Sequence, residues 1–205
     1  MSSKSQKRAK IDDSPFAGET RPKKRESGNQ NNQSPDLGTR TLWTSPPLDI
    51  MSEIITIVIE HGSDWTRAGL SSGTPPAIVI PSLYSQSPDG DIIIGDEIDD
   101  YPQNEVFTVL RDGVIYNWDA LEKIWRYIFE RLAVDPTEYP LTVVEPTWNH
   151  KKNRFRLAEL AFKTFQVPLL NIIKSPITTS YGLGKSASLI IDIGASNVSI
   201  TPIYD

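Results

Sequence analysis

The segments IVIEHGSDWTRAGL (57–70) and LIIDIGASNVSITPI (189–203) follow one plan, and this repetition constrains the fold more than any other feature of the sequence. Each segment starts with three apolar residues and an acid. One further residue, a glycine, a small residue and a second stretch typical of a strand then follow. The two acids, Glu60 and Asp192, stand 132 residues apart. Two similar turns at such a separation indicate a duplicated structural unit.

The residue types in these turns suit the binding of phosphate groups. Glycine lets the backbone bend tightly, so that successive N–H groups can converge on an anion, and a neighbouring serine or alanine leaves room for it. The acid at the strand end could hold the water shell of a magnesium ion. Two facing turns could therefore clamp the phosphates of a nucleotide. The alternative is a pair of ordinary β-hairpins, which either turn alone would favour.

The sequence between the turns predicts alternating strands and helices, and therefore an α/β domain. The segment 53–60 is nearly all apolar and β-branched, which is typical of a strand buried on both faces. Further strands are expected over 65–70, 76–84, 89–97, 140–148 and 169–174. A helix is expected after Asn117, which is a suitable N-cap. Its apolar stripe comprises Leu121, Trp125, Ile128, Phe129 and Leu132.

Two more helices are expected in the second half of the chain. The segment 151–167 is amphipathic, and its expected buried side comprises Phe155, Ala158, Phe162 and Phe165. A short helix should begin at 175, with Ser175 as its cap and Pro176 at its first position. Gly182 and Gly184 should end this helix, and the second repeated segment follows as a hairpin.

Residues 1–50 have the composition of a disordered basic tail. They carry 9 Lys and Arg against 6 Asp and Glu, whereas the remaining residues carry 12 against 20. Two basic clusters about ten residues apart suit a two-part nuclear localisation signal, and the alternative is a tail that is merely solvated. The clusters comprise Lys7, Arg8 and Lys10, and then Arg21, Lys23, Lys24 and Arg25. Met51 could serve as an alternative start.

Composition argues against several other classes of protein. The chain has no cysteine and only two histidines, so no metal site is expected. No apolar run approaches the roughly 20 residues that a membrane-spanning helix requires. The first residues lack the apolar stretch of a secretory signal.

Five segments, taken in order, make the chain resemble the actin family from about residue 54 to residue 205. They read EHGSDWTRAGL, GDE, NWDALEKIWRYIF, EPTWNHKKNRFRLAELAF and DIGASNVSITPIYD. Within the family, YNWDALEKIWRY and GKSASLIIDIGAS look most similar to the nuclear actin-related proteins of the SWI/SNF and RSC chromatin remodellers. The resemblance implies the actin-like, ribonuclease H-like fold. Residues 51–188 would form the first α/β domain, and residues 189–205 would open the second.

The resemblance implies a nucleotide site, but one whose chemistry has degenerated. The residues at its positions are Glu60, Gly62, Ser63, Arg67, Asp192, Gly194 and Ser196. Asp64 adds a carboxylate where actin has glycine, and a like charge about 4 Å from a phosphate costs on the order of 4 kcal/mol. Ser175 and Ser199 replace the Gln and His that orient the attacking water, which is most of what such a protein contributes to hydrolysis. We therefore expect no enzyme activity, and ATP with magnesium is doubtful as a cofactor.

The function that the resemblance implies is that of a non-catalytic scaffold subunit in the nucleus. It would bind a helix of the remodeller ATPase and a second actin-related protein. Tyr181, Gly182 and Gly184 fall on the expected partner surface, unless Tyr181 packs in the core and the glycines only end a helix. The alternative function is a nucleotide-binding cytoskeletal actin-related protein. Contact with nucleic acid would be weak and confined to the basic tail.

The chain has about half the length of an actin, so we expect a truncated or split product. The second α/β domain would be present only as its opening hairpin.

Overall fold

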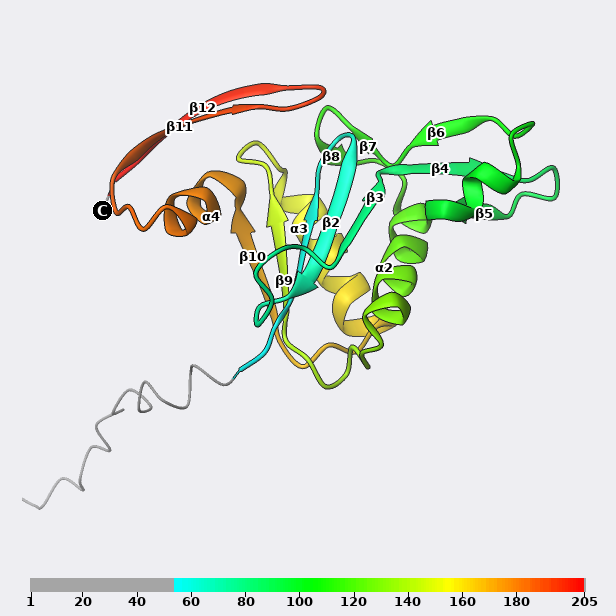
Figure 1. Cartoon of the computed structure of the whole chain (residues 1–205), viewed down its shortest axis with the longest axis horizontal. Coiled ribbons are helices and arrows are strands. Elements are labelled where there is room, and N and C mark those ends of the chain that lie inside the picture. The colour runs from blue at the N-terminus through cyan, green and yellow to red at the C-terminus, as the bar shows by residue number, and fades with distance from the viewer. Residues whose placement is uncertain (1–53, 205) are drawn as a thin grey trace, which may run out of the picture. The chain divides into compact units, whose positions relative to one another are not determined.

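A computed structural model describes residues 54–204 and has a mixed α/β architecture built on a five-stranded sheet (Figure 1). The strand order is β10-β9-β1-β2-β3, with β1 (Ile57–His61) at the centre. β1 pairs in parallel with β9 (Leu141–Glu145), which pairs in parallel with β10 (Leu170–Lys174). β2 (Trp65–Leu70) and β3 (Ile78–Pro81) extend the sheet in antiparallel fashion. The α/β fold class is confirmed. The expected tail and its basic clusters lie outside the described residues.

Parallel pairing brings the carboxyl ends of three strands to one edge of this sheet. Glu60 of β1 lies opposite Val144 of β9, and Glu145 lies opposite Lys174 of β10. Ligands of open α/β sheets bind beyond the carboxyl ends of the strands, so the candidate site is expected at this edge.

The helix α2 (Trp118–Leu132) begins as the sequence predicts. The side chain of Asn117 accepts a hydrogen bond from the Ala120 N–H at 3.0 Å, which satisfies a donor that the helix leaves free. The helix ends at Leu132, and the C-cap residue Ala133 is left-handed with a φ of 54°. The expected stripe is confirmed, with Leu121, Trp125, Ile128 and Phe129 buried and Leu132 packed against them.

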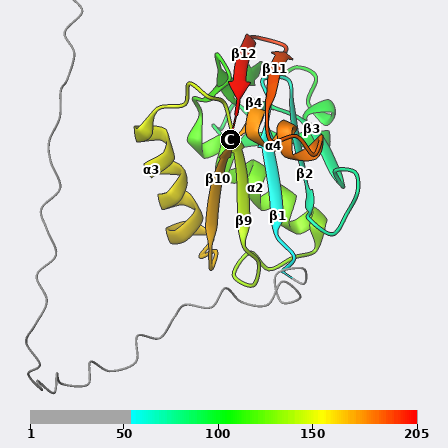
Figure 2. The same ribbon diagram turned by 90° about the vertical axis from the view of Figure 1, so that its left-hand side faces the viewer.

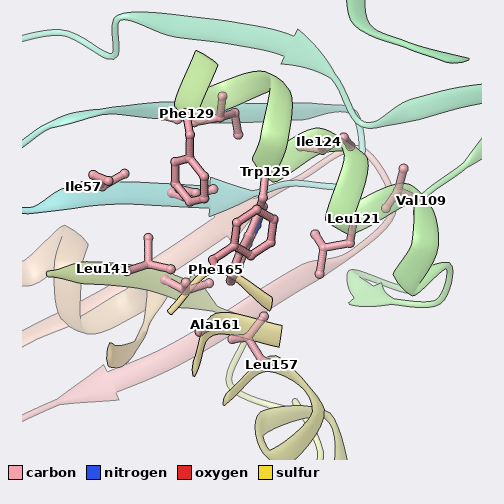
Figure 3. Close-up of a cluster of buried hydrophobic side chains, with 14 of the residues drawn as sticks. Ile57, Val109, Leu121, Ile124, Trp125, Phe129, Leu141, Leu157, Ala161 and Phe165 are labelled. Atoms are coloured by element: carbon pink, nitrogen blue, oxygen red, sulfur yellow. The ribbon is translucent and has the colours of Figure 1, made fainter. Parts of the chain in front are cut away.

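Trp125 occupies the middle of the hydrophobic core, between α2, the sheet and the segment after α3 (Figure 3). Its ring centroid lies 6.3 Å from that of Phe129 and 5.6 Å from that of Phe165. Phe129 and Phe165 meet edge to face at 5.1 Å. Three aromatic rings thus join α2 to the third helical segment over the same face of the sheet.

The third helical segment differs from the sequence prediction in the side that it buries. The α-helix α3 (Lys151–Glu159) is followed by a π-helical turn, η2 (Leu160–Thr164), closed by the Phe165 N–H donating to the Leu160 carbonyl at 3.2 Å. A π-helical turn is wider than an α-helical turn, so residues spaced by four can stay on one side of it. The buried residues have this spacing: Leu157, Ala161 and Phe165. Ala158 is only half-buried, and Phe155 and Phe162 are 62% and 48% exposed, so the predicted side was right for Phe165 alone.

The strand expected over 76–84 is two strands that belong to different sheets. Ser82 separates β3 from β4 (Leu83–Gln86): its N–H donates to Asp64 and its carbonyl accepts from Val109. The strand expected over 89–97 is shorter, because Gly95 turns left-handed at φ 61° after β5 (Ile92–Ile94). The 3₁₀ helix η1 (Gly95–Asp100) follows. β4 pairs with β5 and with β6 (Val106–Thr108), and β7 (Leu110–Arg111) pairs with β8 (Val114–Ile115).

The short helix α4 (Ser175–Gly182) leads into a separate hairpin of β11 (Ser188–Ile193) and β12 (Val198–Ile203). Lys174 is the N-cap of α4 and makes no side-chain capping bond, so the prediction that Ser175 caps the helix is wrong. Ser175 instead accepts hydrogen bonds at its carbonyl from the Thr178 and Thr179 hydroxyls. Gly182 is the last helical residue, and Gly184 is left-handed at φ 62°.

The two faces of β1 are covered unequally. Ile57, Ile59 and His61 are buried toward α2 and α3, whereas Val58 and Glu60 are only half-buried. Figures 1 and 2 show α2 and α3 on one face of the sheet and α4 on the other. The expected burial on both faces is therefore incomplete, because within residues 54–204 the second face is covered mainly by α4 near one end. In the same range, no helix is both long and apolar enough to cross a membrane.

Candidate functional site

A cavity of about 370 Å³ lies where the two repeated turns face each other. Its walls come from the β1–β2 turn, the β11–β12 turn, the residues after β9, the start of α4 and the β7–β8 turn. Six of the seven predicted nucleotide-site residues line it: Glu60, Gly62, Ser63, Arg67, Asp192 and Gly194. Ser196 is not among the lining residues, but its hydroxyl contacts the Ser63 hydroxyl at 2.5 Å.

The two turns are closed by the same backbone hydrogen bond. The Gly62 N–H donates to the Trp65 carbonyl at 3.0 Å, and the Gly194 N–H donates to the Asn197 carbonyl at 2.9 Å. A Cβ at Gly62 would lie 2.9 Å from the Trp65 carbonyl oxygen, so a larger residue cannot stand there without moving the backbone. The corresponding distance at Gly194 is 3.4 Å, which is ordinary contact. The repeated sequence plan therefore folds into a repeated turn.

Carboxylates outnumber cations along the cavity wall. Arg67 lies opposite Glu60 in the β1–β2 register, and its Nη1 is 3.8 Å from Glu60 Oε2. Both side chains are nearly half exposed, so this pair contributes little to stability. Asp64 and Asp192 have no ion-pair partner within 4.0 Å among residues 54–204. An approaching polyphosphate would meet these two unbalanced charges.

Glu145 is a fourth acid of the cavity, and Arg154 of α3 neutralises its charge. It accepts hydrogen bonds from Arg154 Nε at 2.9 Å, from Arg154 Nη2 and from Asn149 Nδ2 at 2.9 Å. The Glu145 side chain is 3% exposed and that of Arg154 is 42% exposed. The hydrogen bond to Glu145 raises the pKa of Arg154 above its usual range, which keeps the guanidinium charged.

Replacing Arg154 by methionine is expected to lower the free energy of unfolding by about 2 kcal/mol, because it leaves the Glu145 carboxylate buried without a cation. The figure is below that for a fully buried pair, since water reaches the Arg154 side chain. Urea unfolding followed by circular dichroism measures the change. Lys163→Met is the matched control, because Lys163 pairs with Glu159 in full solvent, and it should change stability by less than about 0.5 kcal/mol. Equal effects of the two substitutions would contradict the prediction.

His61 forms the floor of the cavity and connects it to the core. Its Nε2 accepts a hydrogen bond from the Trp125 indole N–H at 2.9 Å, so the ring is neutral and carries its proton on Nδ1. Nδ1 donates to the Thr66 hydroxyl at 3.1 Å, which contacts the Ser82 hydroxyl at 2.8 Å. Burial lowers the pKa of His61 to about 4.

The family model for actin matches residues 51–205, which is most of the chain. The chain belongs to the actin family. The actin-like identity expected from the five ordered segments is thereby confirmed.

Several actin-related proteins are similar to the chain over about three quarters of its length. Actin-related protein 7 of Saccharomyces cerevisiae is 38% identical over 164 residues, which cover 73% of this chain and 34% of that protein. The SWI/SNF and RSC complexes subunit arp42 of Schizosaccharomyces pombe is 35% identical over 162 residues, 76% of this chain and 38% of that protein. Actin-related protein 4 of Yarrowia lipolytica is 30% identical over 170 residues, which cover 75% of this chain and 39% of that protein. The chain thus spans well under half the length of these relatives.

Several of the positions at which the resemblance indicates a change from actin line the cavity. Ser175 at the start of α4 and Ser199 in β12 both line it, as do Asp64 and Ala195. Ser175 and Ser199 stand where the resemblance places the water-orienting side chains. Asp64 and Ala195 stand where it places a glycine and an acid in the two phosphate turns.

The predicted partner residues lie at the C-terminal end of α4. Tyr181 is 71% exposed, so within residues 54–204 it does not pack in the core, which was the alternative interpretation. No atom lies within 4 Å of the Cβ positions of Gly182 and Gly184, so packing does not require glycine at either position. Whether a partner binds here stays a prediction.

Sequence reasoning does not single out His61, Glu145, Trp148 or Asn197, although all four line the cavity. Trp148 donates its indole N–H to the Asp112 carbonyl at 3.0 Å and so holds the β7–β8 turn at the cavity rim. That turn is left-handed at Asp112 and Gly113, with φ of 52° and 73°. The Asp-Gly pair is the one local signal that could have placed a tight hairpin here. The other contacts join residues far apart in the sequence.

Proposed function

We propose that this chain acts as a non-catalytic, actin-related scaffold in an ATP-dependent chromatin-remodelling complex. The observation that carries the proposal is the cavity between the repeated turns. It retains the two tight turns of a phosphate clamp, whereas serines stand at the positions for orienting water. A serine hydroxyl is too short to reach the water that a glutamine or histidine would hold, and positioning is the main contribution of such a protein to hydrolysis.

The charges of the cavity also support a scaffold rather than a nucleotide-driven machine. Arg67 is the one cation among the lining residues, and Glu60 already lies beside it. Asp64 and Asp192 remain unbalanced within residues 54–204. We propose that the fold does not depend on bound ATP or magnesium.

The proposed partners follow from the relatives and from the exposed end of α4. As its name states, arp42 is a subunit of the SWI/SNF and RSC complexes, and we extend membership of such a complex to this chain. A helix of the remodeller ATPase would pack on Tyr181, whose side chain is available in solvent, with Gly182 and Gly184 leaving room for the helix. A second actin-related protein would bind beside it. Nuclear entry would use the two basic clusters, which lie outside the described residues.

One experiment tests both halves of this proposal. The tagged chain is purified from nuclear extract, with Tyr181→Ala and Asp192→Ala as matched variants. We expect a remodeller ATPase to co-purify with the wild-type chain, and to be lost when the ATPase helix next to the motor is deleted. The Tyr181→Ala variant should retain about ten-fold less of the ATPase. ATP turnover should come from the motor and be unaffected by Asp192→Ala.

Two results would overturn the proposal. Turnover by the purified chain alone that Asp192→Ala abolishes would make it an enzyme. Recovery only as a free protein that pellets under polymerising salt would instead support the cytoskeletal alternative.

A further inference from the structure

The two repeated turns touch each other directly. Ser63 in the first turn and Ser196 in the second are 133 residues apart in sequence, and their hydroxyl oxygens are 2.5 Å apart. The Ser196 hydroxyl also donates a hydrogen bond to the side-chain oxygen of Asn197. A hydroxyl has one proton to donate, so the chain of donors runs from Ser63 to Ser196 to Asn197.

This direction leaves neither serine with a proton for a ligand. A phosphate held between the turns would need donors, because its oxygens are acceptors. The Ser63 proton is used by Ser196, and the Ser196 proton is used by Asn197. A phosphate could bind both hydroxyls only after the contact between them was broken.

Among residues 54–204, hydrogen bonds join the hairpin to the rest of the domain at its base and at this contact. At the base, the Ser180 hydroxyl of α4 lies 2.9 Å from the Ser188 hydroxyl of β11. At the tip, Asn197 also abuts the β7–β8 turn, where a Cβ on Gly113 would lie 3.5 Å from its side-chain oxygen. Figure 1 shows β11 and β12 arching from α4 toward that turn. The tip of the hairpin therefore depends on Ser63, Ser196 and Asn197 for its place.

We infer that these three residues form a clasp that joins the hairpin to the first domain without a nucleotide. In this arrangement the direct hydroxyl contact stands where a bridging phosphate would otherwise link the two turns. Closure of the cavity is then built into the chain and does not respond to ATP. The inference goes beyond the scaffold proposal, because it would hold whichever complex the chain enters.

Disulfide trapping in the full chain tests the clasp sharply, because the protein contains no cysteine of its own. The Ser63→Cys, Ser196→Cys double variant should form an intramolecular disulfide under mild oxidation. Excess magnesium ATP should change the rate of cross-linking by less than about two-fold. A ligand that binds the open and the closed arrangement of the two turns equally does not shift the equilibrium between them. The matched control is Ser71→Cys, Ser196→Cys: Ser71 bonds to Thr56 just beyond the other end of β2, and this pair should not cross-link within the molecule.

A second measurement covers the case in which the cysteine variant does not fold. In Ser63→Ala, the Gly194 amide, which closes the second turn, should exchange its hydrogen about five-fold faster, the loss expected for one hydrogen bond. Amides in the middle of α2 should be unchanged. The inference is overturned if the cysteine pair cross-links no faster than the control pair, or if magnesium ATP slows it about ten-fold or more. It is also overturned if Gly194 exchange in Ser63→Ala equals that of the wild type.

Discussion

Replacing Trp125 by alanine is expected to lower the free energy of unfolding by about 4 kcal/mol, the range for removing a fully buried tryptophan. Trp125 is 0% exposed and lies between Phe129 and Phe165, so the cavity left behind would sit where α2, η2 and the sheet meet. Urea unfolding should be followed by far-ultraviolet circular dichroism, because the substitution removes a fluorophore. A loss below about 1 kcal/mol would mean that the core does not depend on this side chain.

Trp125→Phe separates packing from hydrogen bonding at the same position. Phenylalanine keeps an aromatic ring but removes the indole N–H, so Nε2 of the buried His61 loses its donor. An unsatisfied buried acceptor costs about 1–3 kcal/mol, so this variant should fall between the wild type and Trp125→Ala.

Stability is expected to fall by about 3 kcal/mol as the pH is lowered from about 6.5 to about 4, through His61 alone. In the folded protein the ring stays neutral until the pH nears 4, whereas in the unfolded chain it takes up a proton at its ordinary pKa of about 6.5. Between these values the unfolded state binds more protons, so the free energy of unfolding decreases as the pH falls. The contribution is fully present above pH 6.5 and stops changing below the folded pKa.

His61→Gln provides the reference for this pH dependence, because glutamine does not titrate while every carboxylate and His150 remain. The difference in unfolding free energy between wild type and variant, measured in urea from pH 7 to pH 4, isolates the histidine. Parallel pH profiles for the two proteins would show that His61 is not held neutral by its surroundings.

The parts of the fold that the sequence predicts are those set by local interactions. The start of α2 follows from Asn117, whose side chain reaches an amide three residues away, and its buried stripe follows from helical spacing alone. The two tight turns follow from a glycine after each strand-ending acid. Each turn carries its own local geometry, and nearly all of the predicted site residues belong to these two turns and line one cavity.

The parts that escape prediction depend on contacts between distant residues. The third helix ends in a π-helical turn, and Phe165, which follows that turn, packs against Trp125 of a distant helix. The strand breaks at Ser82 because this residue makes two hydrogen bonds outside its own strand. Its N–H donates to the Asp64 carbonyl, and its carbonyl accepts from the Val109 N–H. The Ser63–Ser196 contact joins the two turns across the whole domain. None of these pairings has a signature within a short window of sequence.

The central place of β1 in the sheet has a consequence for the order in which the chain can fold during synthesis. β1, β2 and β3 can form a meander as soon as they are made, because their pairings are between neighbours in sequence. The other edge of β1 must wait for β9, since Ile57 pairs with Leu141 about 80 residues later. Until then a strand of apolar residues has one open edge, which is a site for pairing with other chains. Chaperone demand should therefore be highest while the ribosome is translating the residues between β3 and β9.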